Sequence, residues 1–221
     1  MRCFGDSYQL LRASEPLILS ASLDDSTCQA LANLIPLLGC GEEAAAVAFH
    51  RLANQGAFAR ATQAALHSIG EEEQIHEGLL VGLAAAMPPP EKADETRRAA
   101  RRFHVSLAKG GPTLHLARIA AIDAAVCMIL SRLTARGAKL ATSVSVANVL
   151  RRIRNDEAKH VTIARTIGTS LPDRARLREA GAQARVELSS LIASGGEAFE
   201  GLGVDPDRLV SDVARLPNGL L

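Results

Sequence analysis

The chain is poor in aromatic residues, which make up 3% of its 221 residues and include no tryptophan and one tyrosine, Tyr8. Apolar residues nevertheless reach 48%, and alanine and leucine dominate among them. Such a composition favours helices that pack closely through small side chains. The length suffices for one well-buried core, and nothing in the composition requires a second domain. We therefore expect a single all-α domain over residues 1–221.

A charge imbalance is also missing, since 25 basic and 24 acidic residues give a formal net charge of +1. Nucleic acid or an anionic membrane surface is therefore not expected as a partner. A dense basic run is formed by Arg97-Arg98 and Arg101-Arg102. A solvated helix face accounts for this run.

The four cysteines lack the close spacing of a zinc knuckle or a redox CxxC motif. They are Cys3, Cys28, Cys40 and Cys127. Unpaired thiols in a reducing compartment are the expectation. The N-terminal sequence lacks the layout of a signal peptide, and no apolar run reaches the length of a membrane span. These absences predict a cytoplasmic protein without a membrane span.

Helical periodicity and capping signals divide the chain into a bundle core with additions at both ends. Helices are expected at about residues 26–41, 42–54, 57–87, 114–136 and 143–168, then from Pro172 to about 193 and at 205–216. The first two are either separate or one helix bent near Pro36. Residues 88–111 suit a crossover between bundle ends, with a short helix around Phe103 and His104. Thr113 is the candidate cap of the helix that follows.

Two Glu-x-x-His motifs stand out, Glu73 to His76 and Glu157 to His160. Residues i and i+3 share one face of a helix, so each motif directs a carboxylate and an imidazole to one place. One such match is weak evidence, because roughly 0.4 are expected by chance in a chain of this composition. Two matches on separate amphipathic helices favour a dinuclear metal site, for which two further helices must each supply a carboxylate.

Asp123 is the only acid between Glu95 and Asp156, and it lies within the most apolar helical segment. Burial of a lone carboxylate is costly unless a cation or strong donors compensate. A metal would compensate; the alternative is pairing with Arg118 or a hydroxyl. For the first helix both Glu42 and Glu43 are candidates, and their helical stripes do not decide between them.

The fourth-helix segment from Val149 to His160 resembles that of bacterioferritins and rubrerythrins. Its Asp-Glu-x-Lys-His sequence is also close to the Asp-Glu-x-Arg-His of bacterial multicomponent monooxygenases. The chain is thus similar, over about residues 40–170, to the ferritin-like superfamily of non-haem di-iron proteins. In bacterioferritin-like sequences a tyrosine follows the first glutamate by seven residues. His50 follows Glu43 at that interval, so the resemblance selects Glu43.

This resemblance implies a ferritin-like four-helix bundle with one long crossover, holding two iron ions; manganese or an iron–manganese pair is also compatible. Glu73 and Glu157 would bridge the ions, and His76 and His160 would each bind one. Glu43 and Asp123 would be terminal ligands, although the family usually has glutamate in place of this aspartate. The expected supporting residues are His50, together with Glu72 and Asp156, which would each accept the free N–H of a ligand histidine.

The other histidines have simpler interpretations: His67 and His104 are expected at the surface, and His115 in a structural role. The residues expected to flank the site are apolar and partly small. They are Ala46, Val47, Ile69, Leu80, Ile119, Val126, Cys127, Ile153 and Val161.

An apolar site of this kind favours an oxygenase or oxidase that uses O2 to oxidise a small apolar or amphiphilic metabolite. The spacings between successive presumed carboxylate ligands, 30, 50 and 34 residues, resemble those of ubiquinone-synthesis hydroxylases and aldehyde-deformylating oxygenases. Without a flavin, iron–sulfur or nucleotide motif, electrons would come from a separate reductase. The long ends favour a substrate cover or a homodimer. The alternatives are a ferroxidase or rubrerythrin-like peroxidase, and a metal-free helical interaction module.

Overall fold

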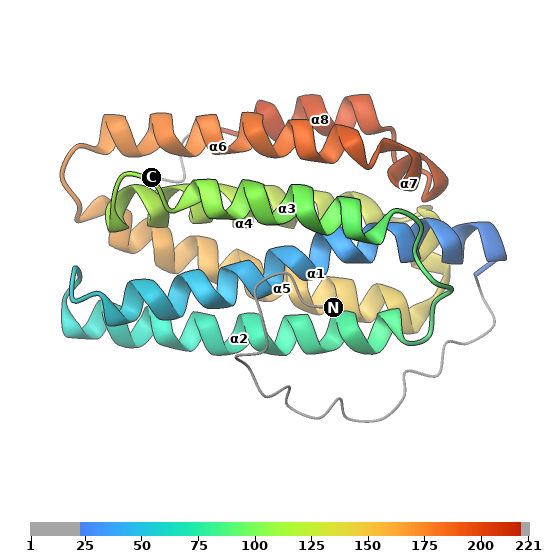
Figure 1. The fold of residues 1–221 in the computed structure, drawn as a ribbon, viewed down its shortest axis with the longest axis horizontal. Coiled ribbons are helices and arrows are strands. Elements are labelled where there is room, and N and C mark those ends of the chain that lie inside the picture. The colour runs from blue at the N-terminus through green and yellow to red at the C-terminus, as the bar shows by residue number, and fades with distance from the viewer. Residues whose placement is uncertain (1–22, 218–221) are drawn as a thin grey trace.

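The computed structural model describes residues 23–217, and this range is helical, without strands (Figure 1). The predicted lead-in at residues 1–22, with Cys3 and Tyr8, lies outside the described residues. In chain order the helices are α1 (Asp25–Asn54), α2 (Arg60–Ala84), α3 (Ala93–Leu107), α4 (Pro112–Leu133), the 3-10 turn η1 (Lys139–Thr142), α5 (Val144–Thr169), α6 (Arg174–Ser194), α7 (Gly196–Gly201) and α8 (Pro206–Ala214). The all-α prediction is confirmed.

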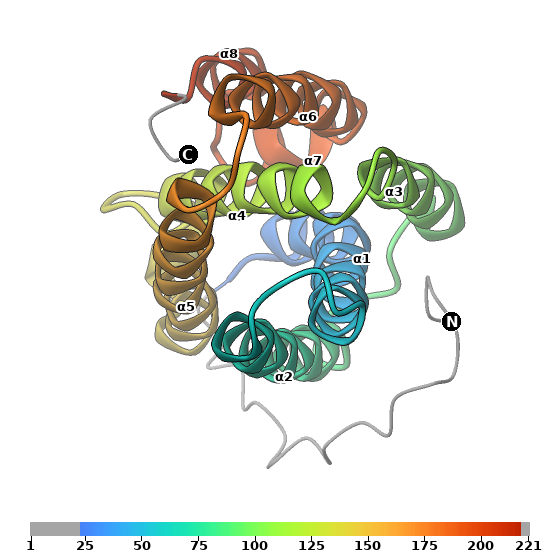
Figure 2. The ribbon, with the colours of Figure 1, turned by 90° about the vertical axis from the view of Figure 1, so that its left-hand side faces the viewer.

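Helices α1, α2, α5 and α4 surround a common interior, as the view along their axes shows (Figure 2). Helix α1 packs against α2, and α4 packs against α5. Helices α6 and α8 lie outside α4, while α3 lies beside α1 (Figure 2). The four elements that carry the predicted metal ligands therefore face one another, although they are distant in sequence.

The first helix is continuous for 30 residues, so of the two alternatives left open by the sequence the single helix is correct. Asp24 caps it, and the side chain of Asp24 accepts a hydrogen bond of 2.7 Å from the backbone N–H of Thr27. Pro36 lies inside α1 and is buried. Proline removes one backbone hydrogen bond from a helix. Burial of α1 between its neighbours offsets this loss.

The crossover is more regular than the sequence indicated. Its helix α3 spans 15 residues and buries Ala100, Phe103 and Leu107. Thr113 is not the cap of α4, because Pro112 occupies the first helical turn after Gly111. Residues 196–201 form the short helix α7, which the sequence did not predict.

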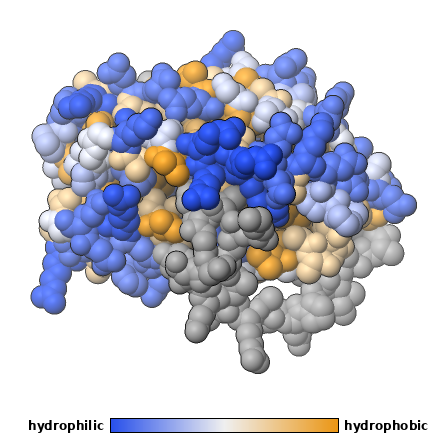
Figure 3. Space-filling model, in the orientation of Figure 1, coloured by the Kyte–Doolittle hydropathy of each residue, from blue (hydrophilic) through white to orange (hydrophobic). Residues whose placement is uncertain are grey.

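Hydrophilic side chains dominate the face over α3 and α6, with scattered hydrophobic residues between them (Figure 3). Arg98, Arg101 and Arg102 on α3 are exposed, and Arg97 is half-buried. The predicted solvated basic face is therefore present. Cys28, Cys40 and Cys127 form no disulfide with one another.

By length and composition, α1 and α4 could each cross a bilayer. Most of each apolar window, 67% in α1 and 72% in α4, is buried inside the protein. Core helices of soluble proteins pass the same test, so the two helices are weak evidence for a membrane span.

Candidate metal centre

The two Glu-x-x-His motifs face each other across the interior, one from α2 and one from α5. The imidazole rings of His76 and His160 lie with their centroids 5.8 Å apart and tilted by 33°. Glu73, His76, Glu157 and His160 are each at most 2% exposed. The i, i+3 spacing thus places both carboxylates and both imidazoles inside the protein.

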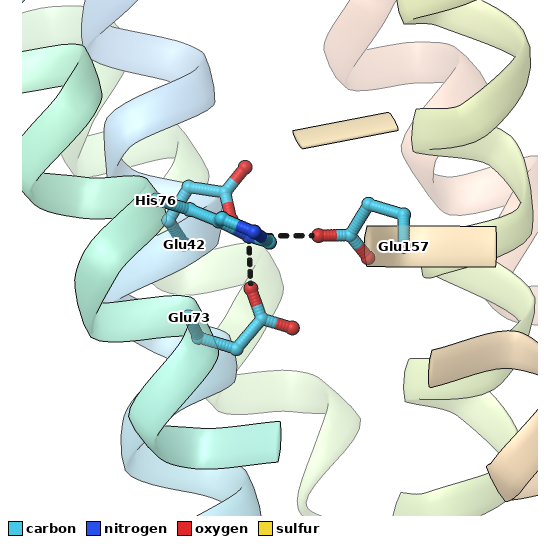
Figure 4. A group of neighbouring side chains, drawn as sticks. All are labelled: Glu42, Glu73, His76 and Glu157. Carbon is cyan, nitrogen blue, oxygen red and sulfur yellow. Dashed lines mark hydrogen bonds and ion pairs between the residues drawn. The ribbon is translucent and has the colours of Figure 1, made fainter. Parts of the chain in front are cut away.

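Each of the two motif glutamates reaches both histidines. One oxygen of Glu73 lies 3.2 Å from Nδ1 of His76, and its other oxygen lies 3.0 Å from Nδ1 of His160. One oxygen of Glu157 lies 3.3 Å from Nδ1 of His76, and its other oxygen lies 3.6 Å from Nδ1 of His160. The carboxylates of Glu73 and Glu157 therefore span the gap between two inward-facing ring nitrogens (Figure 4 shows the His76 half).

The outward-facing nitrogens contact the acids that precede the motifs, in a crossed arrangement. Nε2 of His160 on α5 lies 2.7 Å from Oε2 of Glu72 on α2. Nε2 of His76 on α2 lies 3.3 Å from Oδ2 of Asp156 on α5. These are the contacts that the sequence predicted for Glu72 and Asp156. Such a contact orients an imidazole so that its other nitrogen can bind a metal.

The first helix contributes Glu42 and not Glu43 to this cluster. Oε2 of Glu42 lies 3.2 Å from Nδ1 of His76 (Figure 4). Glu42, Glu73, His76 and Glu157 each have a ligand atom within 4.8 Å of the others. Glu43 is buried instead in a groove between α1 and α2, which Glu77 also lines. The choice of Glu43 from the sequence does not match this geometry.

The orientation of α1 follows from its largest side chains. Phe49 and Leu52 are fully buried and share a helical stripe with Glu42, whereas the Glu43 stripe carries the polar His50. The hydrophobic face turns inward and carries Glu42 with it. Counted from Glu42, the interval of seven residues leads to Phe49, whose ring meets that of His160 edge-on at 6.3 Å. Phe49 therefore places an aromatic ring beside the cluster.

His50 does not lie against the cluster, contrary to the expectation. Its Nε2 lies 3.0 Å from the amide nitrogen of Gln74, and its ring meets that of His67. The ring also packs over Gly70, where an added Cβ would come within 2.9 Å. The error has the same cause as the choice of Glu43, because both residues lie on the α1 stripe that faces α2.

Asp123 on α4 lies near this group. It is 4% exposed and lines one cavity together with Glu42, Glu73 and Glu157. Its Oδ2 atom is buried without a hydrogen-bond partner among the described residues, so the alternative of pairing with Arg118 or a hydroxyl finds no support for this atom. Arg118 instead donates to the backbone oxygens of Leu107 and Lys109.

Without bound ions, several buried acids and histidines of the cluster have shifted pKa values. Burial raises the pKa of Glu42 and of Asp123 well above the usual range, and the other carboxylates raise both further. Although burial lowers the pKa of His160, Glu157 and Glu73 offset this effect and raise it to about 11. Hydrogen bonds to the glutamates raise the pKa of His76 in the same way. In the absence of metal ions, protons bound to these carboxyls and imidazoles therefore balance the charge of the cluster.

The buried donor set could hold a metal ion. Small divalent ions bind nitrogen and oxygen at about 2.1 Å, so two ligands at right angles lie about 3 Å apart. The contacts of His76 and His160 with the glutamates, between 3.0 and 3.6 Å, have this spacing. Oε1 of Glu73 and Nδ1 of His160 also lack hydrogen-bond partners of good geometry among the described residues. Carboxylate and imidazole ligands suit hard and borderline divalent cations better than soft ones.

A narrow cavity of about 70 Å³ leads from the carboxylates between α1 and α4 to α3, α6 and α7. Of the residues predicted to flank the site, Ile119 and Val126 line this cavity. Because Glu42 faces inward, α1 presents Gly41, Ala44 and Ala45 to it rather than Ala46 and Val47. The remainder of the wall is formed by Leu37, Leu38, Ala48, His104, Leu107, His115, Ile122, Ile129, Leu188, Leu191, Ile192 and Phe199.

Two of these residues, His104 and His115, were given simpler interpretations from the sequence. His104 is half-buried on α3 and lines the cavity, so its expected surface position is wrong. The length of α3 explains this, because a regular helix turns His104 towards Gly41 on α1.

No protein-family model matches the chain, and no curated protein matches it in sequence. The interpretation of the site therefore depends on its own geometry.

Proposed function

We propose that the protein is a ferritin-like di-iron oxidoreductase that uses O2 to oxidise a small apolar or amphiphilic molecule. The observation that carries the proposal is the placement of Glu73 and Glu157, each with one oxygen near either inward-facing imidazole nitrogen. Two ferrous ions bound in this cluster would supply electrons for the reduction of O2. Manganese, or one ion of each metal, suits the same ligands.

The residues divide into two half-sites that share the bridging glutamates. His76 and Glu42 form one half, and the contact of 3.2 Å joins them. We assign His160 and Asp123 to the other half. Four carboxylates balance the charge of two divalent ions. Asp123 is one methylene shorter than glutamate, so the half-site of His160 is the more open one.

The surrounding residues favour oxidation of an organic molecule over iron storage. The cavity that ends at Glu42 and Asp123 has aliphatic walls apart from a few polar groups. Apolar walls bind apolar substrate and exclude water from the site. Electrons would come from a separate donor protein, and the homodimer and the cytoplasmic location stay predictions from the sequence.

Metal analysis of the full-length protein tests the metal site. After anaerobic loading with ferrous iron and removal of excess ions, we expect about two iron ions per chain. The variant Glu73→Gln/Glu157→Gln should bind fewer than one, whereas Glu71→Gln, an exposed acid on α2, should load normally. Fewer than one ion per chain in the unmodified protein would contradict the proposal.

Oxygen consumption tests the reaction class. The di-ferrous protein should consume O2 faster when an organic molecule occupies the cavity than when the cavity is empty. Assembly into a large cage that accumulates iron mineral would instead indicate storage. The same assay on Ala45→Phe, which fills the cavity beside Glu42, should lose the stimulation while iron loading is retained.

A further inference from the structure

His104 and His115 are the only polar residues of the cavity wall apart from the four carboxylates of the metal cluster, among the residues that the structure describes. His104 comes from the crossover helix α3, and His115 from the first turns of α4. The other wall residues are alanine, leucine, isoleucine, valine, phenylalanine and glycine. The presence of two polar imidazoles in an otherwise apolar wall requires a physical explanation.

Neither imidazole has a hydrogen-bond partner within residues 23–217. His115 is 7% exposed, and the ring contact recorded for His104 is an edge-on one with Phe103 at 4.9 Å. Polar groups in a protein interior are normally hydrogen-bonded. The ring nitrogens of His104 and His115 therefore offer hydrogen bonds that the described part of the chain does not use.

Both rings are uncharged at neutral pH. Burial and the nearby His115 lower the pKa of His104 to about 4. Burial, with the charges of Arg51 and Arg118, lowers the pKa of His115 to about 4. A neutral imidazole presents one N–H donor and one nitrogen acceptor, a pattern that suits a hydroxyl or a carbonyl group. It supplies no charge to balance a carboxylate or an ammonium.

We propose that His104 and His115 form a subsite that binds the uncharged polar group of an amphiphilic ligand, such as an alcohol or a ketone, whose aliphatic part fills the cavity. The cavity volume of about 70 Å³ accommodates about five to seven groups of the size of a methylene or a water. A six-carbon alcohol matches this size. The inference rests on the proposed function only for the fate of the ligand, because binding does not need the metal.

Binding of 1-hexanol to the full-length, metal-free protein tests the subsite, with ligand-observed NMR as the measurement. We expect 1-hexanol to bind at least about ten times more tightly than hexanoate or hexylammonium, because either ion would be buried without a counter-charge. Benzene, which lacks a polar group, serves as a probe of the apolar walls alone. Equal or tighter binding of hexanoate would overturn the proposal.

The variants His104→Leu and His115→Leu should each weaken 1-hexanol binding about five- to tenfold, as expected for loss of one neutral hydrogen bond. Their benzene binding should be retained or improved, which shows that the cavity still folds. His115→Gln keeps a donor and an acceptor and should restore part of the affinity. The matched control is His67→Leu, a histidine that does not line the cavity. Unchanged 1-hexanol affinity in both leucine variants would overturn the subsite.

Iron loading of the same variants separates this inference from the proposed function. Both leucine variants should load as much iron as the unmodified protein, because neither histidine contacts the cluster. If iron loads normally but the histidine variants bind 1-hexanol unchanged, the subsite fails alone. If no form of the protein loads iron but the alcohol binds in a histidine-dependent way, the proposed function fails alone.

Discussion

At the scale of single residues, a shift of one position along α1 decides which carboxylate faces the cluster. Adjacent residues on a helix point about 100° apart, so Glu42 meets His76 while Glu43 lies in the groove between α1 and α2. The two glutamates have the same chemistry and similar burial. They therefore form a matched pair for testing which side chain binds metal.

The Glu42→Gln variant should bind Mn²⁺ at least about tenfold more weakly than the unmodified protein, since a neutral amide replaces a charged ligand. Glu43→Gln should change the affinity by less than about threefold, because Glu43 is not one of the four residues whose ligand atoms converge. Equilibrium titration with Mn²⁺, followed by electron paramagnetic resonance of the free ion, measures both. A larger loss in Glu43→Gln would contradict the assignment of Glu42.

The crossed contacts of Glu72 and Asp156 carry a second residue-scale prediction. Removal of a carboxylate that orients a ligand histidine typically costs about 10- to 100-fold in metal affinity. Glu72→Gln should therefore weaken binding at His160, and Asp156→Asn at His76. Glu71→Gln changes an exposed neighbour that contacts His67 and should have no effect. The same Mn²⁺ titration would contradict these roles if all three variants matched the parent.

At the scale of helices, close approaches through small residues hold the additions against the core. Helix α7 lies against the start of α1, and an added Cβ on Gly201 would come within 2.8 Å of the Cβ of Ala30. Neither atom can rotate away, since each is attached directly to a helix backbone. In contrast, a Cβ on Gly39 within α1 would meet nothing within 4 Å.

Gly201→Ala should lower the free energy of unfolding by about 1–3 kcal/mol through overpacking between α1 and α7. Gly39→Ala should leave it unchanged or raise it by up to about 1 kcal/mol, because alanine is the better helix former. Urea denaturation, monitored by circular dichroism, compares the two variants. Equal stability of both would show that α7 does not pack on α1 as described.

At the scale of the whole molecule, metal binding and protonation compete. Glu42 and Asp123 must lose protons that burial favours, and His76 and His160 must lose protons that the glutamates favour. Metal binding therefore releases protons and strengthens as pH rises. In the metal-free protein, the elevated pKa of His160 has the opposite effect. Its contribution to stability is complete below about 6.5, the ordinary pKa, and is lost as pH rises through about 11.

The increase in melting temperature on addition of Mn²⁺ should therefore grow between pH 6 and pH 8. Over this interval the contribution of His160 to the stability of the metal-free protein should fall. Asp123→Asn should leave the metal-free protein as stable or more stable, because it removes a buried carboxyl with an unpartnered oxygen, yet it should reduce the Mn²⁺ effect. Differential scanning fluorimetry measures the melting temperature of the unmodified protein and of Asp123→Asn, with and without Mn²⁺. A metal effect independent of pH would contradict this coupling.

The sequence by itself determined the all-α class, most helix bounds and the four motif residues. Hydrophobic periodicity and the i, i+3 spacing are local properties, so Glu73, His76, Glu157 and His160 were found without knowledge of packing. The isolation of Asp123 in an apolar helix was a local signal of the same kind. The crossed contacts of Glu72 and Asp156 followed from their place beside the motifs.

Only the tertiary structure decided what depends on the rotation and packing of whole helices. Burial of Phe49 and Leu52 turned α1 so that Glu42 faces the cluster, and it placed His50 and Glu43 on another face. The packing of α3 brought His104 to the cavity beside Gly41. Such choices follow from the free energy of burying several helices against one another, which no single stretch of sequence contains.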